Sequence, residues 1–149
     1  MRMHHLRRTQ VVARPIEDVF AFFADAANLE HITPPELRFR ILTPTPINVQ
    51  QGTLIDYRLS LFGVPFGWKT RISTWQPPFM FVDEQLRGPY REWIHTHTFE
   101  TVPEGTRLSD HVQFRLPLHP LSWPVLPLVR RQVEHIFDYR TRIIAEVFR

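Results

Sequence analysis

Hydrophobic and polar residues alternate with a period of two through the central part of the chain. Six runs between residues 37 and 116 follow this pattern, at 37–43, 52–62, 68–75, 79–87, 88–100 and 106–116. Such alternation is typical of strands that bury one face. Turn residues separate the runs, and most connections are too short for a parallel crossover. The pattern therefore predicts six consecutive antiparallel strands.

A further strand and three helices are predicted on either side of this region. Residues 3–13 favour a strand, and Pro15 suits the first turn of a helix that begins there. Asp25 can cap a second short helix, which the run Thr33-Pro34-Pro35 terminates. Residues 128–149 contain neither Gly nor Pro and carry apolar residues at helical spacing. Because this last helix is amphipathic, its apolar face is expected to cover one face of the sheet.

Composition narrows the possible classes of protein. A chain of 149 residues fits one domain, which we expect to span residues 1–149. It has no cysteine, which excludes thiolate sites and is compatible with the cytoplasm, the expected location. No stretch approaches the roughly 20 uninterrupted apolar residues that span a bilayer. The 18 cationic residues are scattered and 15 acidic residues offset them, so nucleic acid is not an expected partner.

The order of elements resembles the helix-grip fold of the START-like superfamily, also called SRPBCC, which includes Bet v 1-like proteins and polyketide cyclases. The motifs that carry the resemblance are RPIEDVFAFFADAANLEHITPP, GTLIDYRL, FVDEQLRGPYREWIHTHTFE, the Gly-Thr of EGTRLSDHV, and IFDYR. It implies membership of a bacterial branch, largely uncharacterised, related to polyketide cyclase/dehydrase-like proteins. It also implies an α+β fold in which a curved seven-stranded antiparallel sheet wraps the last helix around a cavity. In relatives this cavity holds lipids, sterols or polyketides, so a small hydrophobic ligand is the expected partner.

Alternation along the strands, with helical spacing in the last helix, indicates which side chains face this cavity. We expect the ligand to contact Tyr57, Trp68, Thr70, Trp93, His95, His97, Phe99, Asp110, Val112, Phe114, Val133, Phe137 and Arg140. Thr74 shares the inward face of its strand. The parity of residues 79–87 is ambiguous, so Asp83, Glu84 or Gln85 could be internal. Arg140 either faces the cavity or extends its charged end from the helix edge into water.

His95, His97 and Asp110 form the candidate polar centre. The apolar faces of their strands stay aligned only if the hairpin at 103–105 leaves two or four residues unpaired. Asp110 then lies directly opposite His97 or diagonal to it, and we predict that the two residues form an interior couple. The favoured interpretation is a polar patch that orients a ligand, with no catalytic residue. The alternative is a cyclase, dehydratase or hydrolase in which this couple performs acid/base chemistry and Tyr57 or Arg140 steadies an oxyanion.

The His-x-His pattern superficially resembles a metal motif. Glu100 follows His97 by three residues and therefore points to the opposite face, and His111 has outward parity. Two imidazoles with Asp110 would make an open site, but we expect no metal and no cofactor. The chain shows neither a nucleophile motif nor a phosphate-binding glycine loop, which favours a binding protein over an enzyme.

The proline-rich apolar stretch from residue 117 to residue 129 ends in Arg130 and Arg131. It is expected to form a lid or to make a weak contact with a membrane surface through Trp123 and the basic pair.

Overall fold

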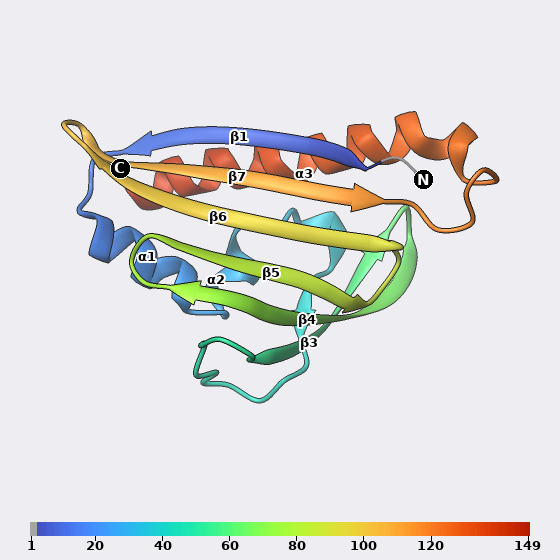
Figure 1. The fold of residues 1–149 in the computed structure, drawn as a ribbon, viewed down its shortest axis with the longest axis horizontal. Helices are drawn as coiled ribbons and strands as arrows, with labels where there is room; N and C mark the ends of the chain where they lie inside the picture. The colour runs from blue at the N-terminus through green and yellow to red at the C-terminus, as the bar shows by residue number, and fades with distance from the viewer. Residues whose placement is uncertain (1–2) are drawn as a thin grey trace.

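Seven strands form one antiparallel sheet in the order β1-β7-β6-β5-β4-β3-β2. The computed structural model describes residues 3–149 (Figure 1). Its elements are β1 (His4–Val12), α1 (Ile16–Ala24), α2 (Asn28–His31), the 3₁₀ turn η1 (Pro35–Leu37), β2 (Arg40–Ile41), β3 (Leu54–Leu61), β4 (Val64–Gln76), β5 (Met80–Arg87), β6 (Glu92–Val102), β7 (Gly105–Arg115), the 3₁₀ turn η2 (Trp123–Val125) and α3 (Leu126–Val147). The predicted series of antiparallel neighbours is confirmed, and β1 joins it beside β7.

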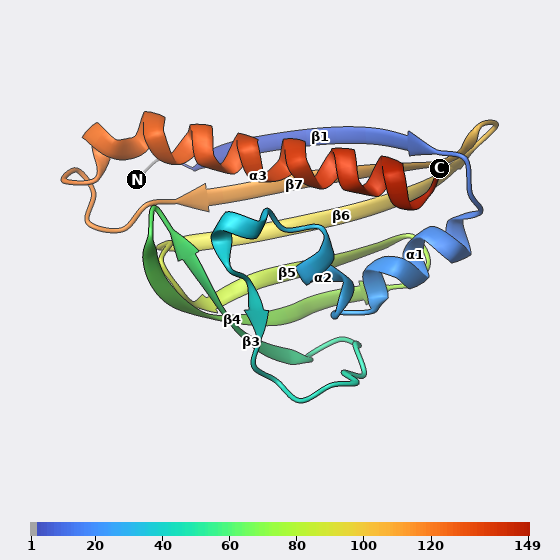
Figure 2. The ribbon, with the colours of Figure 1, turned by 180° about the vertical axis from the view of Figure 1, so that it is seen from behind.

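The three helices lie on the same side of the sheet (Figure 2). Helix α3 runs along β1 and β7, and α1 and α2 cover the part of the sheet beside it. The side of α3 that meets the sheet carries Val133, Phe137, Arg140 and Ile144, all buried, at the spacing of one helical face. Among residues 3–149, no helix is long and apolar enough to cross a membrane.

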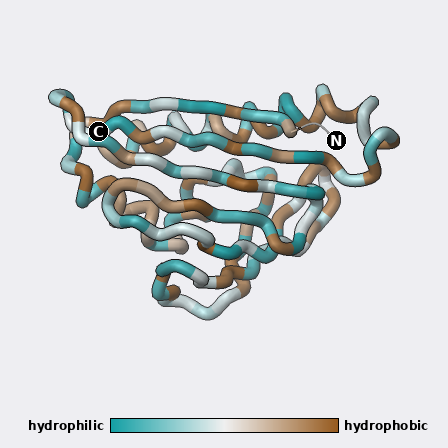
Figure 3. Tube along the Cα trace, in the orientation of Figure 1, coloured by the Kyte–Doolittle hydropathy of each residue, from teal (hydrophilic) through white to brown (hydrophobic). Residues whose placement is uncertain are grey.

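The inner and outer faces of the strands follow the predicted alternation, which is visible as alternating hydropathy along the chain (Figure 3). On β3 the buried side chains are Ile55, Tyr57, Leu59 and Leu61, and on β6 they are His95, His97 and Phe99. The β6–β7 hairpin pairs Val102 with Gly105 and leaves two residues unpaired. This is one of the two loop lengths that the alternation allows, and it sets His97 opposite Asp110.

Two strand boundaries differ from the prediction. Residues 64–67 of the expected link at 63–67 are part of β4, because Leu61 already pairs with Val64 across a two-residue turn. Both turn residues, Phe62 and Gly63, have positive φ, at 53° and 78°, the geometry of tight hairpins. The expected strand at 37–43 shrinks to two residues, because Arg38 adopts a left-handed conformation after η1 with φ of 49°.

The register of β4 and β5 decides the one strand face that alternation left ambiguous. The pairing between them shifts near residues 69–70 and again between Ile72 and Thr74. After the second shift Trp75, and not Thr74, packs inward against Phe20, with ring centroids 5.1 Å apart, so the inward assignment of Thr74 is wrong. On β5 Phe81 is buried, and by the same parity Asp83 faces inward.

Candidate functional site

A cavity of about 170 Å³ lies between the sheet and the helices. Its walls come from the inner faces of β3 to β6, from α3, and from the segment between Phe22 and Phe39. Most of the lining side chains are aromatic or aliphatic, including Phe81, Tyr90 and Trp93. Asp25 also lines the cavity and is exposed, so the cavity opens to solvent beside the turn between α1 and α2.

Two stacked imidazoles form the polar part of the wall. Strand β6 places His95 and His97 two residues apart on its inner face, where they are only 6% and 5% exposed. Their ring centroids lie 3.6 Å apart, and the ring of Phe81 stacks on His97 with a centroid distance of 3.9 Å. This stacking fixes the planes of both imidazoles.

An aspartate on each neighbouring strand holds one of these imidazoles. On β5, Asp83 Oδ2 accepts a hydrogen bond from His97 Nε2 at 2.6 Å. On β7, Asp110 Oδ1 accepts one from His95 Nε2 at 2.7 Å. The remaining contacts are longer, with His95 Nδ1 3.8 Å from Asp83 and His97 Nδ1 3.5 Å from Asp110. Each imidazole therefore lies between two carboxylates.

The prediction that His97 and Asp110 lie opposite each other in the interior is correct. The prediction that they form the main hydrogen-bonded pair needs correction. The two residues are paired across β6 and β7, and 3.5 Å separates His97 Nδ1 from Asp110 Oδ1. The short hydrogen bond of Asp110 goes instead to His95. The reason is Asp83, which lies on the other side of the imidazole pair and accepts the hydrogen bond from His97 Nε2.

Arg140 supplies the positive charge of the site. It is 5% exposed, and its Nη2 lies 3.2 Å from Asp110 Oδ1 and 3.4 Å from His97 Nδ1. Its guanidinium carbon lies 5.0 Å from the ring centroid of Phe23, a favourable cation–π distance. Of the two positions expected for Arg140, the structure has the interior one. Its Nε is buried and has no hydrogen-bond partner among residues 3–149.

The charges of the site follow from burial and from these contacts. Burial alone would raise the pKa of Asp110, but the Arg140 guanidinium and the hydrogen bond from His95 hold that pKa below its usual value. Burial likewise opposes ionisation of Asp83, yet its contacts with the histidines and Arg140 lower its pKa overall. Burial lowers the pKa of His97 to about 4. At neutral pH both aspartates are therefore ionised and His97 is neutral.

The two imidazoles differ in what they can offer a ligand. Because a carboxylate only accepts hydrogen bonds, neutral His97 carries its proton on Nε2 toward Asp83. Its Nδ1 then accepts, and it faces Arg140 Nη2 at 3.4 Å. His95 uses Nε2 to reach Asp110, while its Nδ1 stays 3.8 Å from Asp83, beyond hydrogen-bond distance. His95 Nδ1 is therefore the nitrogen better placed to meet a ligand.

A second, smaller polar group lies on β3 and β4. Thr70 Oγ1 lies 2.7 Å from Tyr57 Oη and accepts a hydrogen bond from Trp68 Nε1 at 3.1 Å. Burial, with a smaller contribution from the charge of Asp83, raises the pKa of Tyr57. The phenol is therefore neutral at neutral pH, and it contributes a hydroxyl rather than a charge to the cavity.

Three possible metal ligands meet at the polar wall, where donor atoms of Asp83, His95 and His97 all lie within 4.8 Å of one another. Two ligands bound at about 2.1 Å in a tetrahedral site would lie about 3.4 Å apart. The 2.6 Å between His97 Nε2 and Asp83 Oδ2 is shorter and is that of a hydrogen bond. As arranged, these two atoms share a proton. The expectation that the chain binds no metal stays a prediction.

The thirteen expected ligand contacts separate into two groups. Those that line the cavity are Tyr57, Trp68, Thr70, Trp93, His95, His97, Phe137 and Arg140. Those that are buried outside its lining are Phe99, Asp110, Val112, Phe114 and Val133. The second group lies where helices pack directly on the sheet and leave no space: the Phe99 ring, for example, meets the rings of Phe20 and Phe23 at 5.2 and 5.5 Å. Asp110 acts on the cavity through two residues of its lining, His95 and Arg140, from which it accepts hydrogen bonds.

Sequence reasoning left many contributors to the cavity unassigned, Asp83 and Tyr90 among them. Asp83 was one of three open choices on its strand, and its shared parity with the aromatic Phe81 excludes Glu84 but is shared by Gln85. Tyr90 follows the Gly88-Pro89 turn and was not assigned to the interior. The Gln85 side chain holds it there by accepting from Tyr90 N at 3.1 Å and donating to Tyr90 O at 2.7 Å. No local pattern in the sequence predicts that contact between Gln85 and the Tyr90 backbone.

Comparison with known proteins identifies the family. A family model described as polyketide cyclase/dehydrase and lipid transport matches residues 12–138. The chain belongs to this family. The match includes Asp83, His95, His97 and Asp110 and stops just before Arg140. A search of curated proteins gave no match.

Solved structures of low sequence identity share the fold of this polyketide cyclase/dehydrase family member. The Zhui aromatase/cyclase from Streptomyces sp. R1128 is 18% identical with a TM-score of 0.77, over 97% of this chain and 93% of that chain. A START superfamily protein from Mycobacterium smegmatis is 14% identical with a TM-score of 0.70, over 97% of both chains. The major latex-like protein 151 from Panax ginseng is 11% identical with a TM-score of 0.68, over 99% and 98%. The predicted α+β helix-grip fold of the START-like superfamily is thus confirmed.

Proposed function

We propose that this protein binds a small hydrophobic or amphipathic molecule in the cavity between its sheet and α3, for transport, sensing or sequestration. The observation that carries the proposal is the division of the cavity wall into an aromatic majority and one compact polar group. Ligand sites of proteins commonly combine apolar walls with a few fixed polar groups that orient the ligand. Here His95, Asp83 and Arg140 are the orienting groups.

The size of the cavity limits the ligand. A volume of about 170 Å³ is close to that of an apolar cavity of about 150 Å³ that holds one benzene ring in another protein. Sites for drug-sized molecules are larger, at about 300–1,000 Å³. The cavity in this conformation therefore suits a single ring or a short chain, and a lipid or a multi-ring polyketide would require α3 or the α1–α2 segment to move away from the sheet.

The polar wall favours a ligand whose polar end both donates and accepts hydrogen bonds. The carboxylate of Asp83 is an acceptor, since it is ionised at neutral pH, and His95 Nδ1 lies 3.8 Å from it. Arg140 supplies the donor, because its Nε has no partner among residues 3–149. A hydroxyl group satisfies both requirements, because it donates to a carboxylate and accepts from a guanidinium. A hydrocarbon without such a group would leave these atoms without hydrogen bonds, which is costly in a buried site.

Native mass spectrometry of the protein purified from its own host tests this proposal. Wild-type protein is expected to carry a small organic molecule that Ala26→Phe excludes, because Ala26 lines the cavity and the larger side chain would fill it. The matched control is Ala27→Phe, since Ala27 is exposed and lies outside the lining. Retention of the molecule by Ala26→Phe, or its loss from Ala27→Phe as well, would place the bound molecule elsewhere and contradict the proposal.

A second candidate function is catalysis of the cyclase, dehydratase or hydrolase kind. The observation that favours it concerns His95. Its Nε2 donates a hydrogen bond to Asp110 Oδ1 at 2.7 Å, and its Nδ1 has no hydrogen bond among residues 3–149. A carboxylate that orients an imidazole in this way prepares the free nitrogen to act as a general base. His97 suits that role less, because Asp83 and Arg140 face its two nitrogens. The alternative expected from the sequence therefore shifts from His97 with Asp110 to His95 with Asp110.

The two functions differ in the fate of the bound molecule. If the protein is an enzyme, incubation of the co-purified molecule with fresh wild-type protein changes its mass by one water or, for a cyclisation that conserves all atoms, changes its chromatographic retention at constant mass. His95→Gln then abolishes the change more completely than His97→Gln. If the protein is a carrier or sensor, both the mass and the retention stay the same with every variant. Equal loss of turnover in the two variants would contradict the assignment of His95 as the general base.

A further inference from the structure

Exposed apolar side chains gather in the segment between β7 and the start of α3. They are Leu118 at 74%, Leu121 at 80%, Trp123 at 67%, Val125 at 47% and Leu128 at 54% exposed, and we call these five residues the pre-helix patch. Isolated exposed hydrophobic residues are normal on a soluble protein. Five within eleven residues, one of them Trp, are a local concentration of exposed apolar side chains, and such concentrations mark interaction surfaces.

The backbone of this segment is folded in a way that keeps the patch exposed. Hydrogen bonds join Ser122 N to Leu118 O at 3.3 Å, Trp123 N to Pro120 O at 3.0 Å and Val125 N to Ser122 O at 3.1 Å. Prolines within the segment further limit its conformations. The side chains are thus carried on an ordered series of turns.

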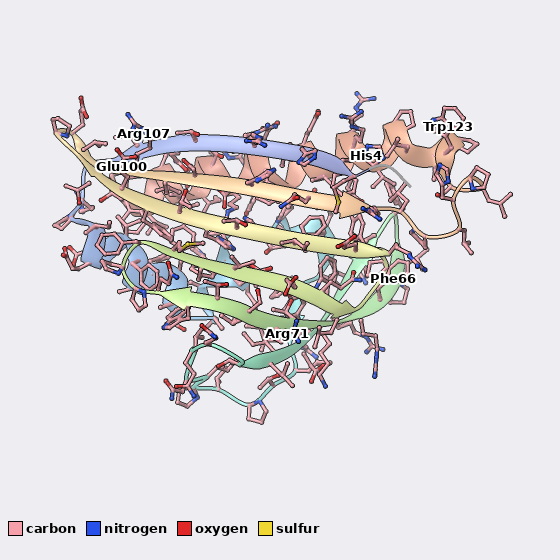
Figure 4. The ribbon with its side chains drawn as sticks, viewed as in Figure 1. His4, Phe66, Arg71, Glu100, Arg107 and Trp123 are labelled. Atoms are coloured by element: carbon pink, nitrogen blue, oxygen red, sulfur yellow. The ribbon has the colours of Figure 1, made fainter. Side chains whose placement is uncertain are left out.

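The patch lies at one end of the molecule. Figure 4 shows Trp123 at the end that also carries His4 and Phe66, with Glu100 and Arg107 at the opposite end. The β3–β4 turn lies at the same end as the pre-helix patch in both ribbon views (Figures 1 and 2). It adds Phe62 and Val64, which are 55% and 52% exposed. Exposed apolar side chains from two separate segments therefore lie at the same end of the molecule.

The segment that carries the patch has no acidic residue. Between Asp110 and Glu134 the chain has none, whereas Arg130 and Arg131 follow the patch directly and are exposed. Trp123, both arginines and Glu134 line a surface groove. Leu and Trp side chains beside a basic pair are the composition of segments that lie on anionic bilayers, with rings among the acyl chains and cations at the phosphates.

We propose that this end of the protein docks on an anionic membrane surface through the pre-helix patch and the Arg130-Arg131 pair. The apolar side chains enter the interface, and the guanidinium groups contact lipid phosphates. A membrane fits better than a protein partner because the patch offers apolar side chains beside a basic pair, with few of the paired polar groups that specific protein interfaces carry. The proposal does not depend on the occupant of the cavity.

Co-sedimentation of the full chain with vesicles tests the proposal. We expect binding to vesicles of equal parts phosphatidylcholine and phosphatidylglycerol, and much weaker binding to phosphatidylcholine alone. Binding is expected to weaken between about 0.01 M and about 1 M salt, because the Debye length falls from about 30 Å to about 3 Å. Absence of binding to the anionic vesicles at low salt would overturn the proposal.

Two pairs of variants test whether binding depends on this surface or only on the net positive charge of the protein. Arg130→Glu with Arg131→Glu is expected to weaken binding on the order of 30-fold. Arg71→Glu with Arg107→Glu changes the net charge equally at positions away from the patch (Figure 4) and is expected to have a small effect. Trp123→Ser is expected to weaken binding about tenfold, whereas Phe79→Ser, at an exposed ring on the β4–β5 turn, leaves it unchanged.

Two further results would overturn the assignment. Equal losses in the patch variants and in their controls would show attraction by net charge alone. Size-exclusion chromatography that finds a dimer in wild-type protein and a monomer in Trp123→Ser would assign the patch to self-association. All of the substituted side chains are exposed or on the surface, so each variant is expected to keep the melting temperature of the wild type, which serves as the folding control.

Discussion

Asp110 is the residue on which the polar centre depends. Its Oδ1 accepts from His95 at 2.7 Å and from Arg140 at 3.2 Å, and it faces His97 at 3.5 Å. A buried carboxylate and a buried guanidinium each pay a large desolvation cost, which their mutual attraction offsets only while both are present. Asp110 is therefore expected to matter more for stability than for direct contact with a ligand.

Substitution of Asp110 by Asn tests this role. Asp110→Asn is expected to lower the free energy of unfolding by about 3 kcal/mol, because buried Arg140 loses the carboxylate that lies 3.2 Å from its Nη2. Asp138→Asn removes the partner of Arg8 in an exposed ion pair of 3.3 Å and should cost less than about 1 kcal/mol. Urea denaturation at neutral pH measures both values. Similar small losses in the two variants would contradict the importance of the buried pair.

The neutral state of His97 predicts a pH dependence. Burial depresses its pKa from 6.5 to about 4 in the folded protein, so between these values the unfolded chain takes up a proton that the folded chain does not. Stability is therefore fully present above pH 6.5 and falls as the pH drops toward 4, by a total on the order of 3 kcal/mol from this residue. Denaturation curves across this window measure the slope.

Two histidine variants test which residue causes the pH dependence of stability. His97→Gln is expected to flatten the profile between pH 6.5 and 4. Burial, with nearby positive charge, also lowers the pKa of His111, but this residue lies on the outer face of β7 and is only partly buried. His111→Gln should therefore remove a smaller part of the slope. A profile left unchanged by His97→Gln would show that another group titrates in this window.

At the scale of elements, β3 and β4 carry the side chains that define one wall of the cavity. The β3 register pairs Tyr57 with Trp68 and Ile55 with Thr70, and the resulting hydrogen bonds converge on the Thr70 hydroxyl. A shift of the pairing by one residue would turn this whole group to the outer face. The hydroxyl thus stabilises both the register of the strand pair and the shape of the cavity.

Removal of that hydroxyl tests its contribution. Thr70→Val keeps the shape of the side chain and leaves the Trp68 Nε1–H and the Tyr57 hydroxyl without their shared partner. The expected loss is about 2 kcal/mol in the free energy of unfolding. Thr98→Val changes the same chemistry at an exposed position on β6 and should have little effect. Thermal unfolding monitored by tryptophan fluorescence measures both, and equal effects would contradict the inferred role.

At the scale of the whole molecule, the helices and the sheet together determine how much space remains. Helix α3 packs directly on β7 through Val133 and its neighbours, while the cavity lies over β3 to β6. Ligand affinity should therefore depend on how well a molecule fits about 170 Å³ without displacing a helix.

A series of ligands of increasing size tests this limit. Single-ring phenols are expected to raise the melting temperature in a concentration-dependent way, because a ligand that binds only the folded state stabilises it by mass action. Linear three-ring analogues are expected to give no shift. Ala26→Phe should abolish the response and Ala27→Phe should retain it. A larger shift with three rings than with one would show that the cavity expands in solution.

The sequence by itself determined the features that depend on local pattern. The period of two placed His95, His97 and Tyr57 on inner faces, because side chains alternate on a pleated strand wherever the sheet is regular. The helical spacing of residues 128–149 indicated which side of α3 meets the sheet, and the motifs of the chain indicated its superfamily.

Only the tertiary structure decided the contacts that depend on several elements at once. The pairing of β5 with β6 set Asp83 opposite His95 and diagonal to His97, where it accepts the hydrogen bond of His97, and this left Asp110 to His95. Arg140 became a buried ion-pair partner because α3 crosses the sheet beside β7. The extent of the cavity depends on the same packing, since the distance of a helix from a sheet is set by the side chains of both and not by the pattern of either one.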